Sequence, residues 1–333
     1  MNTDKRTVGE LATLYAAQIE GKVILTTGVS PGGIGAGFVT GIARARPALL
    51  ILAGRNRGKV QQTAQAISSE NPGVKVRVLD LDLASLDGVR AAAAAVNGWG
   101  DVPCIDVLVN NAGVMAVDWA ATPEGLDSQL VTNYLGPFLF TNLIMGKILK
   151  SPAPRVVNVT SDGHRLGPVR FDDYNFQDGG NYNKWQSYGQ SKTAVMLNAI
   201  SMAEKLGSSH NLVAFSAHPG LVMSNLASHL KMFGESTEYF VSMITLDRLL
   251  GNMPGFVDWS KMDISPDPPE VGGNILAYVA FDPELSKHNG QYILSGRVAD
   301  PWTDTVRPWA TNSVEAEKLW KLSEKLVGQE FSY

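Results

Sequence analysis

The chain has 333 residues, of which 44% are hydrophobic and 18% charged, a composition typical of a globular protein with an ample core. Its formal net charge of −4 provides no basic footprint, so no nucleic-acid partner is expected. One cysteine, Cys104, excludes an internal disulfide framework and favours a reducing compartment, which we expect to be the cytoplasm.

The N-terminal region, residues 1–20, is predicted to form a helix from about residue 8. Leu11, Leu14, Tyr15 and Ile19 recur on one helical face, which we expect to pack on the body of the protein. A helix lying on a membrane surface is the weaker alternative, because the polar face lacks the Lys and Arg that such helices carry. No apolar run approaches the roughly 18 residues of a membrane helix, so neither an integral membrane segment nor a targeting segment is expected. No metal site is expected either.

A glycine-rich stretch follows the first predicted strand. Residues 22–27 are apolar and β-branched, which is typical of a strand buried on both faces. They lead into Gly-Val-Ser-Pro-Gly-Gly-Ile-Gly at 28–35 and then into an apolar-periodic segment that ends near residue 46. This order predicts a dinucleotide site, because glycines let the backbone approach a pyrophosphate and the helix N-terminus supplies amide donors. The candidate cofactor residues are Gly28, Ser30, Gly33, Ile34 and Gly35.

The second predicted strand, 48–53, ends in a stretch without a carboxylate. A cofactor with a free ribose 2′-OH is usually held at this point by Asp or Glu. Here Arg55 stands in its place, with Arg57 nearby. A guanidinium can bind a 2′-phosphate through two hydrogen bonds, whereas a carboxylate would repel it. We therefore favour NADP(H) over NAD(H), the alternative being that Arg55 is a solvated loop residue.

Strands and helices continue to alternate along the chain. We predict strands at 74–79, 105–109, 155–160, 212–217 and 291–294, and helices at 59–69, 86–96, 123–150, 188–206 and 271–281. Such alternation predicts a single α/β domain with a parallel sheet, here residues 21–298, and such sheets bind ligands at the carboxyl ends of their strands.

Polar and small residues occur at several of these strand ends. Asp80 and Asp82 follow the third strand, where a carboxylate could contact an adenine amino group or cap the next helix. Asn-Asn-Ala-Gly at 110–113 follows the fourth strand and suits close passage of a ligand. Ser161 follows the fifth strand. Asn133 lies within the predicted helix 123–150, where Asn is mildly unfavourable, so a polar role is indicated.

Tyr188 and Lys192 are four residues apart at the start of the predicted helix 188–206. They share one helical face, with side chains one turn from each other. An ammonium beside a phenol favours the phenolate, so the pair is a candidate acid/base for a carbonyl or an alcohol. A solvated helix edge is the alternative, since this spacing also arises by chance.

Two segments lie outside the regular alternation. Residues 222–268 are rich in Met and aromatic residues and follow a sheet strand, which favours a helical lid over an apolar pocket. Core helices of an added subdomain are an equal alternative. The C-terminal extension, 299–333, is expected to pack on the body or on a partner subunit.

The motifs together resemble the classical short-chain dehydrogenases/reductases, most closely a retinol-dehydrogenase-like branch that includes many fungal enzymes. The resemblance covers roughly residues 21–296. Its parts occur in family order at strand ends: Thr27-Gly28 through Gly33-Ile34-Gly35, Asn110 to Gly113, Asn133, Ser161, Tyr188 with Lys192, and His218-Pro219-Gly220. It implies a doubly wound, Rossmann-type sheet of seven parallel strands in the order 3-2-1-4-5-6-7.

The resemblance also implies catalytic roles. Tyr188 would give or take the proton at the substrate oxygen, and Lys192 would lower the pKa of Tyr188 and hold the nicotinamide ribose. Ser161 would bind the substrate oxygen. Asn133 would position a helix backbone and a water for a proton relay.

Further residues would contact the cofactor. Asp82 resembles the adenine-contacting acid, and Asn111 the cofactor contact near the ribose. Leu83, Ala112 and Gly113 beside them are further candidate cofactor residues. At the nicotinamide end the corresponding residues are Pro219, Gly220, Val222 and Ser224.

Two positions depart from the family pattern. The glycine turn is one residue longer, which leaves open whether Gly32 or Gly33 takes the central role. Thr160 precedes Ser161 where the branch often has a second Ser.

The resulting hypothesis is an NADP(H)-dependent oxidoreductase that interconverts a carbonyl and an alcohol on a lipophilic small molecule, in secondary metabolism. The alternatives are a catalytically silent NADP(H)-binding sensor or scaffold, and an enzyme that uses the same fold for redox-neutral chemistry. A homodimer through the helices around Asn133 and Tyr188 is a further expectation from the family, although the C-terminal extension could block that contact.

Overall fold

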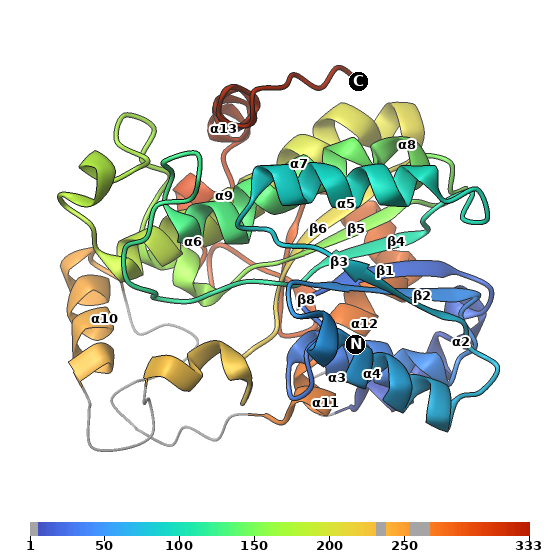
Figure 1. Cartoon of the computed structure of the whole chain (residues 1–333). Coiled ribbons are helices and arrows are strands. Elements are labelled where there is room, and N and C mark those ends of the chain that lie inside the picture. The colour runs from blue at the N-terminus through green and yellow to red at the C-terminus, as the bar shows by residue number, and fades with distance from the viewer. Residues whose placement is uncertain (1–5, 231–237, 253–266) are drawn as a thin grey trace.

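A computed structural model describes residues 6–230, 238–252 and 267–333 of the chain. These residues form one sheet with strands in the order β3-β2-β1-β4-β5-β6-β7-β8, covered by helices on both faces (Figure 1). The strands are β1 (Val23–Thr27), β2 (Leu49–Gly54), β3 (Val76–Asp80), β4 (Val107–Asn110), β5 (Arg155–Val159), β6 (Val213–His218), β7 (Tyr292–Leu294) and β8 (Arg297–Val298).

The first seven strands are parallel, which confirms the predicted doubly wound α/β fold and its strand order. β1 pairs with β2 on one side and with β4 on the other, and its residues from Ile24 onward are buried because both faces are covered. Between β1 and β4 the strand order reverses, and ligands of such sheets bind in the crevice at that point.

The sheet has one strand more than predicted. β8 runs antiparallel to β7, with Leu294 paired to Arg297. The two residues between them, Ser295 and Gly296, both have positive φ, at 50° and 72°. Positive φ at both central residues matches the right-handed twist of two paired strands, so this short loop folds as a hairpin. The sheet is therefore eight-stranded, with an antiparallel edge.

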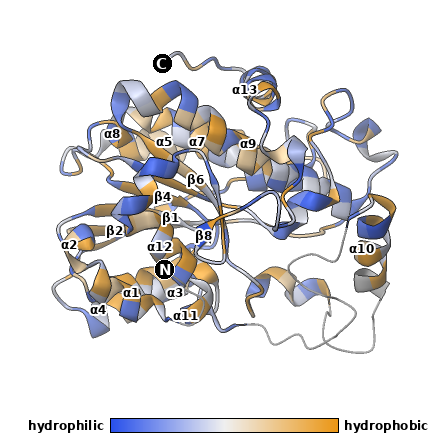
Figure 2. Cartoon of the chain, turned by 180° about the vertical axis from the view of Figure 1, so that it is seen from behind, coloured by the Kyte–Doolittle hydropathy of each residue, from blue (hydrophilic) through white to orange (hydrophobic). Residues whose placement is uncertain are grey.

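Helices form a layer on each face of the sheet (Figure 1). One layer contains α5 (Leu86–Gly98), α7 (Gly136–Leu143) and α9 (Lys184–His210), and the other contains α3 (Ile34–Ala43), α4 (Arg57–Glu70) and α12 (Asn274–Phe281). Further helices are α1 (Val8–Leu14), α2 (Ala16–Ile19), α6 (Ser128–Leu130), α8 (Met145–Ile148), α10 (Glu238–Leu249), α11 (Pro269–Gly272) and α13 (Ser313–Val327). Figure 2 shows hydrophobic residues concentrated in the sheet and in the helices beside it. In the described ranges no helix combines the length and the apolarity needed to cross a membrane.

The predicted helix 123–150 is interrupted. Its first half contains a π-helical turn, Val131–Leu135, which includes Asn133, and α7 begins directly after it. At that junction a Cβ on Gly136 would lie 2.2 Å from the carbonyl oxygen of Leu83. The helix thus approaches the loop after β3 so closely that only glycine fits, and π-turns of this kind often mark functional sites.

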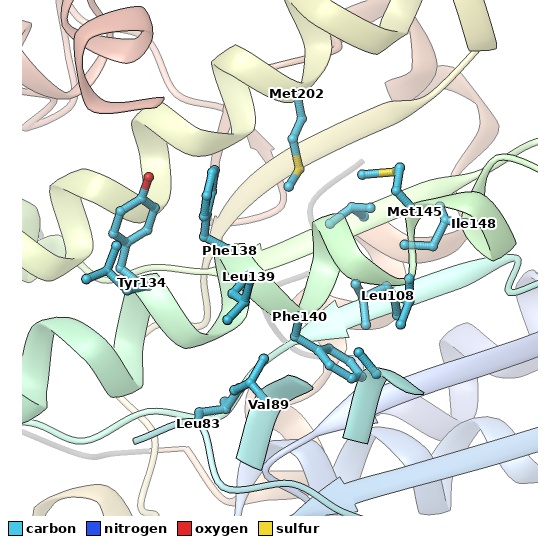
Figure 3. Close-up of a cluster of buried hydrophobic side chains, with 14 of the residues drawn as sticks. Leu83, Val89, Leu108, Tyr134, Phe138, Leu139, Phe140, Met145, Ile148 and Met202 are labelled. Carbon is cyan, nitrogen blue, oxygen red and sulfur yellow. The ribbon is translucent and has the colours of Figure 1, made fainter. Parts of the chain in front are cut away.

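The core lies between the sheet and the helix layers. Figure 3 shows the larger cluster, in which Phe138, Leu139 and Phe140 of α7 pack among side chains of the sheet, α5 and α9. The C-terminal extension adds to it: the Trp320 ring of α13 meets the Phe138 ring edge-on at 5.0 Å. Tyr134 and Ser323 also share a buried hydrogen bond of 2.6 Å. The extension therefore packs on the body of the protein, against α7 and α9.

Candidate active site

A cavity of about 510 Å³ opens at the carboxyl ends of the central strands. Most of the predicted site residues line it: Gly28, Ser30, Gly33, Ile34, Arg55, Asn111, Ala112, Gly113, Ser161, Tyr188, Lys192, Pro219, Gly220, Val222 and Ser224. These residues come from segments between Gly28 and Ser224, and the parallel sheet gathers them at one edge. The predicted residues that do not line it are Gly35, Asp82, Leu83 and Asn133.

The glycine turn has a specific backbone geometry. The amide of Gly33 donates to the carbonyl of Ser30 at 3.1 Å, and Gly32 has φ of 75°. With Pro31 before it, this is a type II turn, whose third residue must tolerate positive φ. Gly33 has φ of −104° and precedes α3 as its N-cap. Gly32 therefore supplies the left-handed backbone, and Gly33 begins the helix whose N-terminus faces the cavity.

Asn111 holds this turn in place. Its side-chain Nδ2 donates to the carbonyls of Thr27 at 2.9 Å and Gly28 at 3.0 Å. A Cβ on Gly35 would lie 2.6 Å from the same Nδ2, and one on Gly28 would lie 2.7 Å from the Cα of Ala112. The turn and the β4 end are thus in close contact, and Gly28, Ser30, Gly33 and Ile34 of the turn line the cavity, where glycines let a pyrophosphate group approach the backbone. The chain's own residues therefore suit a dinucleotide cofactor.

Tyr188 is buried at the start of α9, and its ring lies against the loop after β5. A Cβ on Gly163 would lie 2.5 Å from Cε1 of Tyr188, so glycine is required there. Burial raises the pKa of Tyr188 to about 12, although its hydrogen bond with Ser161 acts in the opposite direction. The helix-face argument from the sequence predicted a lowered pKa, whereas in the folded protein burial is the dominant influence and the pKa is raised. The phenol is therefore a proton donor at neutral pH.

Lys192 lies one helical turn along from Tyr188, as predicted. Its Nζ is 5.6 Å from the centre of the Tyr188 ring and donates to the carbonyl of Val159 at 3.1 Å. It also lies 3.5 Å from the position of a Cβ on Gly113. Only 5% of Lys192 is exposed, and burial lowers its pKa to about 8. The ammonium form predominates at pH 7 and faces the cavity beside the phenol.

Asn133 acts on the backbone rather than on the cavity. Its side chain accepts from the amide of Val114 at 2.8 Å and donates to the carbonyl of the same residue at 2.9 Å. It also donates to the Oγ of Ser191 at 2.9 Å. Asn133 thus connects the loop after β4 to α9 between Tyr188 and Lys192, and its role in a proton relay remains a prediction.

The residues after β2 and β3 differ in their surroundings. Arg55 is exposed, lines the cavity and has no ion-pair partner in the part of the chain that is described, whereas Arg57 pairs with Asp80 at 2.7 Å. Asp82 accepts from the amide of Ala84 at 3.1 Å, and Leu83 is buried in the core. Their adenine contacts remain predictions.

A buried charge cluster beside Ser161 was missed by the sequence reasoning. Arg165, whose side chain is 4% exposed, pairs with Asp247 of α10 at 2.8 Å and with Asp162 at 3.3 Å. All three line the cavity. The spacing of Asp162 and Arg165 directly after Ser161 was a signal available in the sequence, but nothing local indicated a partner more than eighty residues away.

The lid region contributes an apolar wall. Met243 of α10 lines the cavity with Met115, Leu166 and Trp185, and α10 is also held by a hydrogen bond of 3.1 Å from Trp185 Nε1 to Ser242. The predicted lid residues Met232, Phe233, Met253 and Met262 lie outside the described residues. In the described part, α10 acts as a wall of the cavity.

The cavity is also bridged near the glycine turn. Nδ2 of Asn225, in a 3-10 helix after β6 (Asn225–Leu230), donates to the carbonyl of Pro31 at 2.9 Å. This carbonyl belongs to the type II turn, in which Pro31 precedes Gly32.

Comparison with known proteins agrees with this geometry. The sequence pattern of the family described as short chain dehydrogenase matches residues 22–175. Human retinol dehydrogenase 13 is 32% identical over 314 residues, which cover 94% of this chain and 87% of that protein. The chain belongs to the classical short-chain dehydrogenase/reductase family. It is an oxidoreductase of alcohol and carbonyl groups that uses a nicotinamide cofactor, with a retinol-dehydrogenase-like sequence.

Solved structures show the same fold. The structure of an uncharacterised protein from Mycobacterium paratuberculosis superposes on this chain with a TM-score of 0.67 at 27% sequence identity. The match covers 96% of this chain and 98% of the Mycobacterium chain. A short chain dehydrogenase from Shigella flexneri, solved in complex with NADP, has a TM-score of 0.59 at 18% identity, with 84% and 99% covered.

Proposed function

We propose that this short-chain dehydrogenase interconverts a carbonyl and an alcohol on a lipophilic small molecule and uses NADP(H) for the reaction. The observation that carries the proposal is the placement of Ser161, Tyr188 and Lys192 in one cavity with the glycine turn. Human retinol dehydrogenase 13 is named for retinol, a lipophilic alcohol, and its similarity to this chain supports this substrate class.

The chain's residues define the proton chemistry. A bound nicotinamide ring gives or accepts the hydride. Tyr188, protonated at neutral pH, donates its proton to the substrate oxygen during reduction, and Ser161 stabilises the charge that develops on that oxygen. Lys192, charged beside the phenol, stabilises the resulting phenolate. In oxidation the same proton returns to Tyr188.

The substrate side of the cavity is apolar. Met115, Leu166, Trp185 and Met243 form that wall, and Arg165 forms an ion pair with each of Asp162 and Asp247. A lipophilic carbonyl compound buries apolar surface there without leaving a charge unpaired. A role in secondary metabolism and a cytoplasmic location are part of the proposal, the latter resting on the single, unpaired Cys104.

Tyr188→Phe tests the reaction. We expect NADPH to bind as in the wild type and turnover of a lipophilic ketone or aldehyde to fall by about 10²-fold or more, since the proton donor is lost. Absorbance of NADPH follows turnover, and Tyr278→Phe, on the opposite face of the sheet, is the matched control. Wild-type turnover in the Tyr188 variant would refute the assigned role, and a wild type that turns over no compound of a broad panel would favour the sensor or redox-neutral alternatives.

Arg55→Ala tests the cofactor preference. Because Arg55 is exposed at the cavity without an ion-pair partner among the described residues, it can bind a 2′-phosphate at little desolvation cost. We expect Kd for NADPH to rise at least tenfold, with Kd for NADH unchanged. Arg57→Ala, which breaks the pair with Asp80, controls for loss of a nearby charge. Equal affinity of the wild type for NADPH and NADH would contradict the preference.

A further inference from the structure

His164 is the third residue after Ser161 and is completely buried. It belongs to a 3-10 helix, Asp162–Leu166, for which Ser161 is the N-cap. Its backbone amide and its ring Nδ1 both face the carbonyl oxygen of Ser161, at 3.1 Å and 3.0 Å. A carbonyl oxygen only accepts, so Nδ1 carries the ring proton and donates it. Two donors of one residue therefore hold the backbone of Ser161.

The other ring nitrogen faces the C-terminal extension. The backbone amide of Arg307 lies 3.4 Å from Nε2 of His164, and the backbone of Thr305 also faces the imidazole. With the proton on Nδ1, Nε2 accepts from the Arg307 amide. The indole Nε1 of Trp309 donates to the carbonyl of His164 at 3.1 Å. Arg307 and Trp309, which are 143 and 145 positions from His164 in the sequence, thus both contact the loop that carries Ser161.

The same carbonyl joins the loop to α9. Thr193, the neighbour of Lys192, places its Oγ1 hydroxyl 2.8 Å from the carbonyl of Gly167 and 3.1 Å from that of His164, so its single proton is shared between two carbonyls of this loop. The imidazole also packs edge-on against Tyr292 of β7, with ring centres 5.5 Å apart. Full burial lowers the pKa of His164 to about 4, which keeps the ring neutral and its two nitrogens in complementary roles. A histidine with a packing role alone would not need these hydrogen bonds. Its two ring nitrogens and its carbonyl contact Ser161, the C-terminal extension and α9.

We propose that His164 is a positioning residue through which the C-terminal extension fixes Ser161 relative to Tyr188 and Lys192. Ser161 Oγ must meet the substrate oxygen at hydrogen-bond distance, and a displacement of its backbone by a fraction of an ångström weakens that contact more in the transition state than in the bound substrate. The extension is thereby part of the active site, although no residue beyond Asp247 lines the cavity among those described. This inference rests on the proposed carbonyl/alcohol chemistry.

Three variants test it by steady-state kinetics. His164→Phe keeps the ring but removes both nitrogens, and we expect kcat to fall about tenfold or more while KM for the carbonyl substrate and Kd for NADPH stay within about twofold. His164→Asn keeps an amide donor near the Nδ1 position and should recover most of kcat. Trp309→Phe removes only the indole donor and should lower kcat by a smaller factor. His288→Phe, at an exposed histidine, is the matched control.

Amide hydrogen exchange supplies a second measurement that needs no substrate. In His164→Phe the peptide covering residues 161–167 should exchange faster than in the wild type, while peptides of β1 and β4 exchange as before. The inference is overturned if kcat of the Phe variant is unchanged, if Asn and Phe variants are equally impaired, or if exchange at 161–167 does not increase. A wild type without carbonyl activity defeats the proposed function instead, and the exchange comparison then decides on His164.

Discussion

Replacing Lys192 by Met should make the protein more stable while it abolishes turnover. Lys192 is charged at pH 7 although it is almost fully buried, and its Nζ donates to Val159 as its only hydrogen bond in the described structure. Met has a similar length and no charge to bury. We expect the variant to bind apolar ligands in the cavity but to lose the acid/base step, because the phenolate of Tyr188 has no cation beside it.

The size of the gain follows from the pKa of Lys192, which burial lowers from 10.5 to about 8. Each tenfold change in proton affinity is worth about 1.4 kcal/mol, so charging Lys192 in the folded state costs about 3 kcal/mol. The carbonyl of Val159 loses its side-chain donor in the variant, which offsets about 1 kcal/mol. A net gain of about 2 kcal/mol at pH 7 remains.

The pH dependence has a definite sign. Between pH 8 and pH 10.5 the unfolded lysine holds more protons than the folded one, so wild-type stability rises with pH through that window. The advantage of Lys192→Met is therefore full below about pH 8, falls to zero within this window, and is reversed by about 1 kcal/mol above it, where only the lost hydrogen bond to Val159 remains. Tyr188, with a pKa of about 12 in the folded protein, stays protonated there throughout this window, so the pH dependence of the difference reports on Lys192.

Urea unfolding followed by tryptophan fluorescence at pH 7, 9 and 10.5 measures this difference, with the protein free of cofactor. Lys59→Met, at an exposed lysine of α4, should show no pH-dependent difference. If Lys192→Met is less stable than the wild type at pH 7, or if its advantage is the same at every pH, the argument from a buried charge is refuted.

Two other predictions concern the cofactor end of the cavity. Gly35→Ala places a Cβ 2.6 Å from Nδ2 of Asn111, so we expect the free energy of unfolding, measured in urea, to fall by about 1–3 kcal/mol. NADPH binding, measured by fluorescence titration, should weaken at least tenfold. An unchanged affinity would contradict the close packing of the glycine turn against Asn111. Asn225→Ala removes the 2.9 Å hydrogen bond to Pro31, so NADPH should dissociate several-fold faster in stopped-flow fluorescence, whereas Ser228→Ala in the same segment should not change the rate.

The fold was accessible from the sequence because its signals are local. Apolar β-branched runs such as 22–27 and 48–53 are strands wherever both faces of a sheet are covered, and the alternation with helices leaves few topologies. The eighth strand escaped prediction since it is two residues long and depends on the turn at Ser295 and Gly296. The π-turn around Asn133 escaped too, because it follows from the contact between Gly136 and the loop after β3.

The site residues were accessible for the same reason. Tyr188 and Lys192 are one helical turn apart, and the glycine turn directly follows its strand. The local sequence is therefore enough to predict where each group lies on its own element. The partners of those groups are distant in sequence. Asn111 bonds to Thr27 and Gly28 only once β1 and β4 are paired in the sheet. Arg165 pairs with Asp247 only once α10 packs beside the loop after β5.

Sequence alone determined the kind of chemistry here: a phenol and an ammonium on one helical face, a serine at a strand end and a glycine turn before a helix. The tertiary structure decided how those groups behave. Burial raises the pKa of Tyr188, against the expectation from its spacing to Lys192, and lowers the pKa of Lys192, because desolvation comes from segments that pack over them. The tertiary structure also brings His164 into contact with the C-terminal extension. The hydrogen bond between residues 143 positions apart forms only on folding, so no local sequence pattern predicts it.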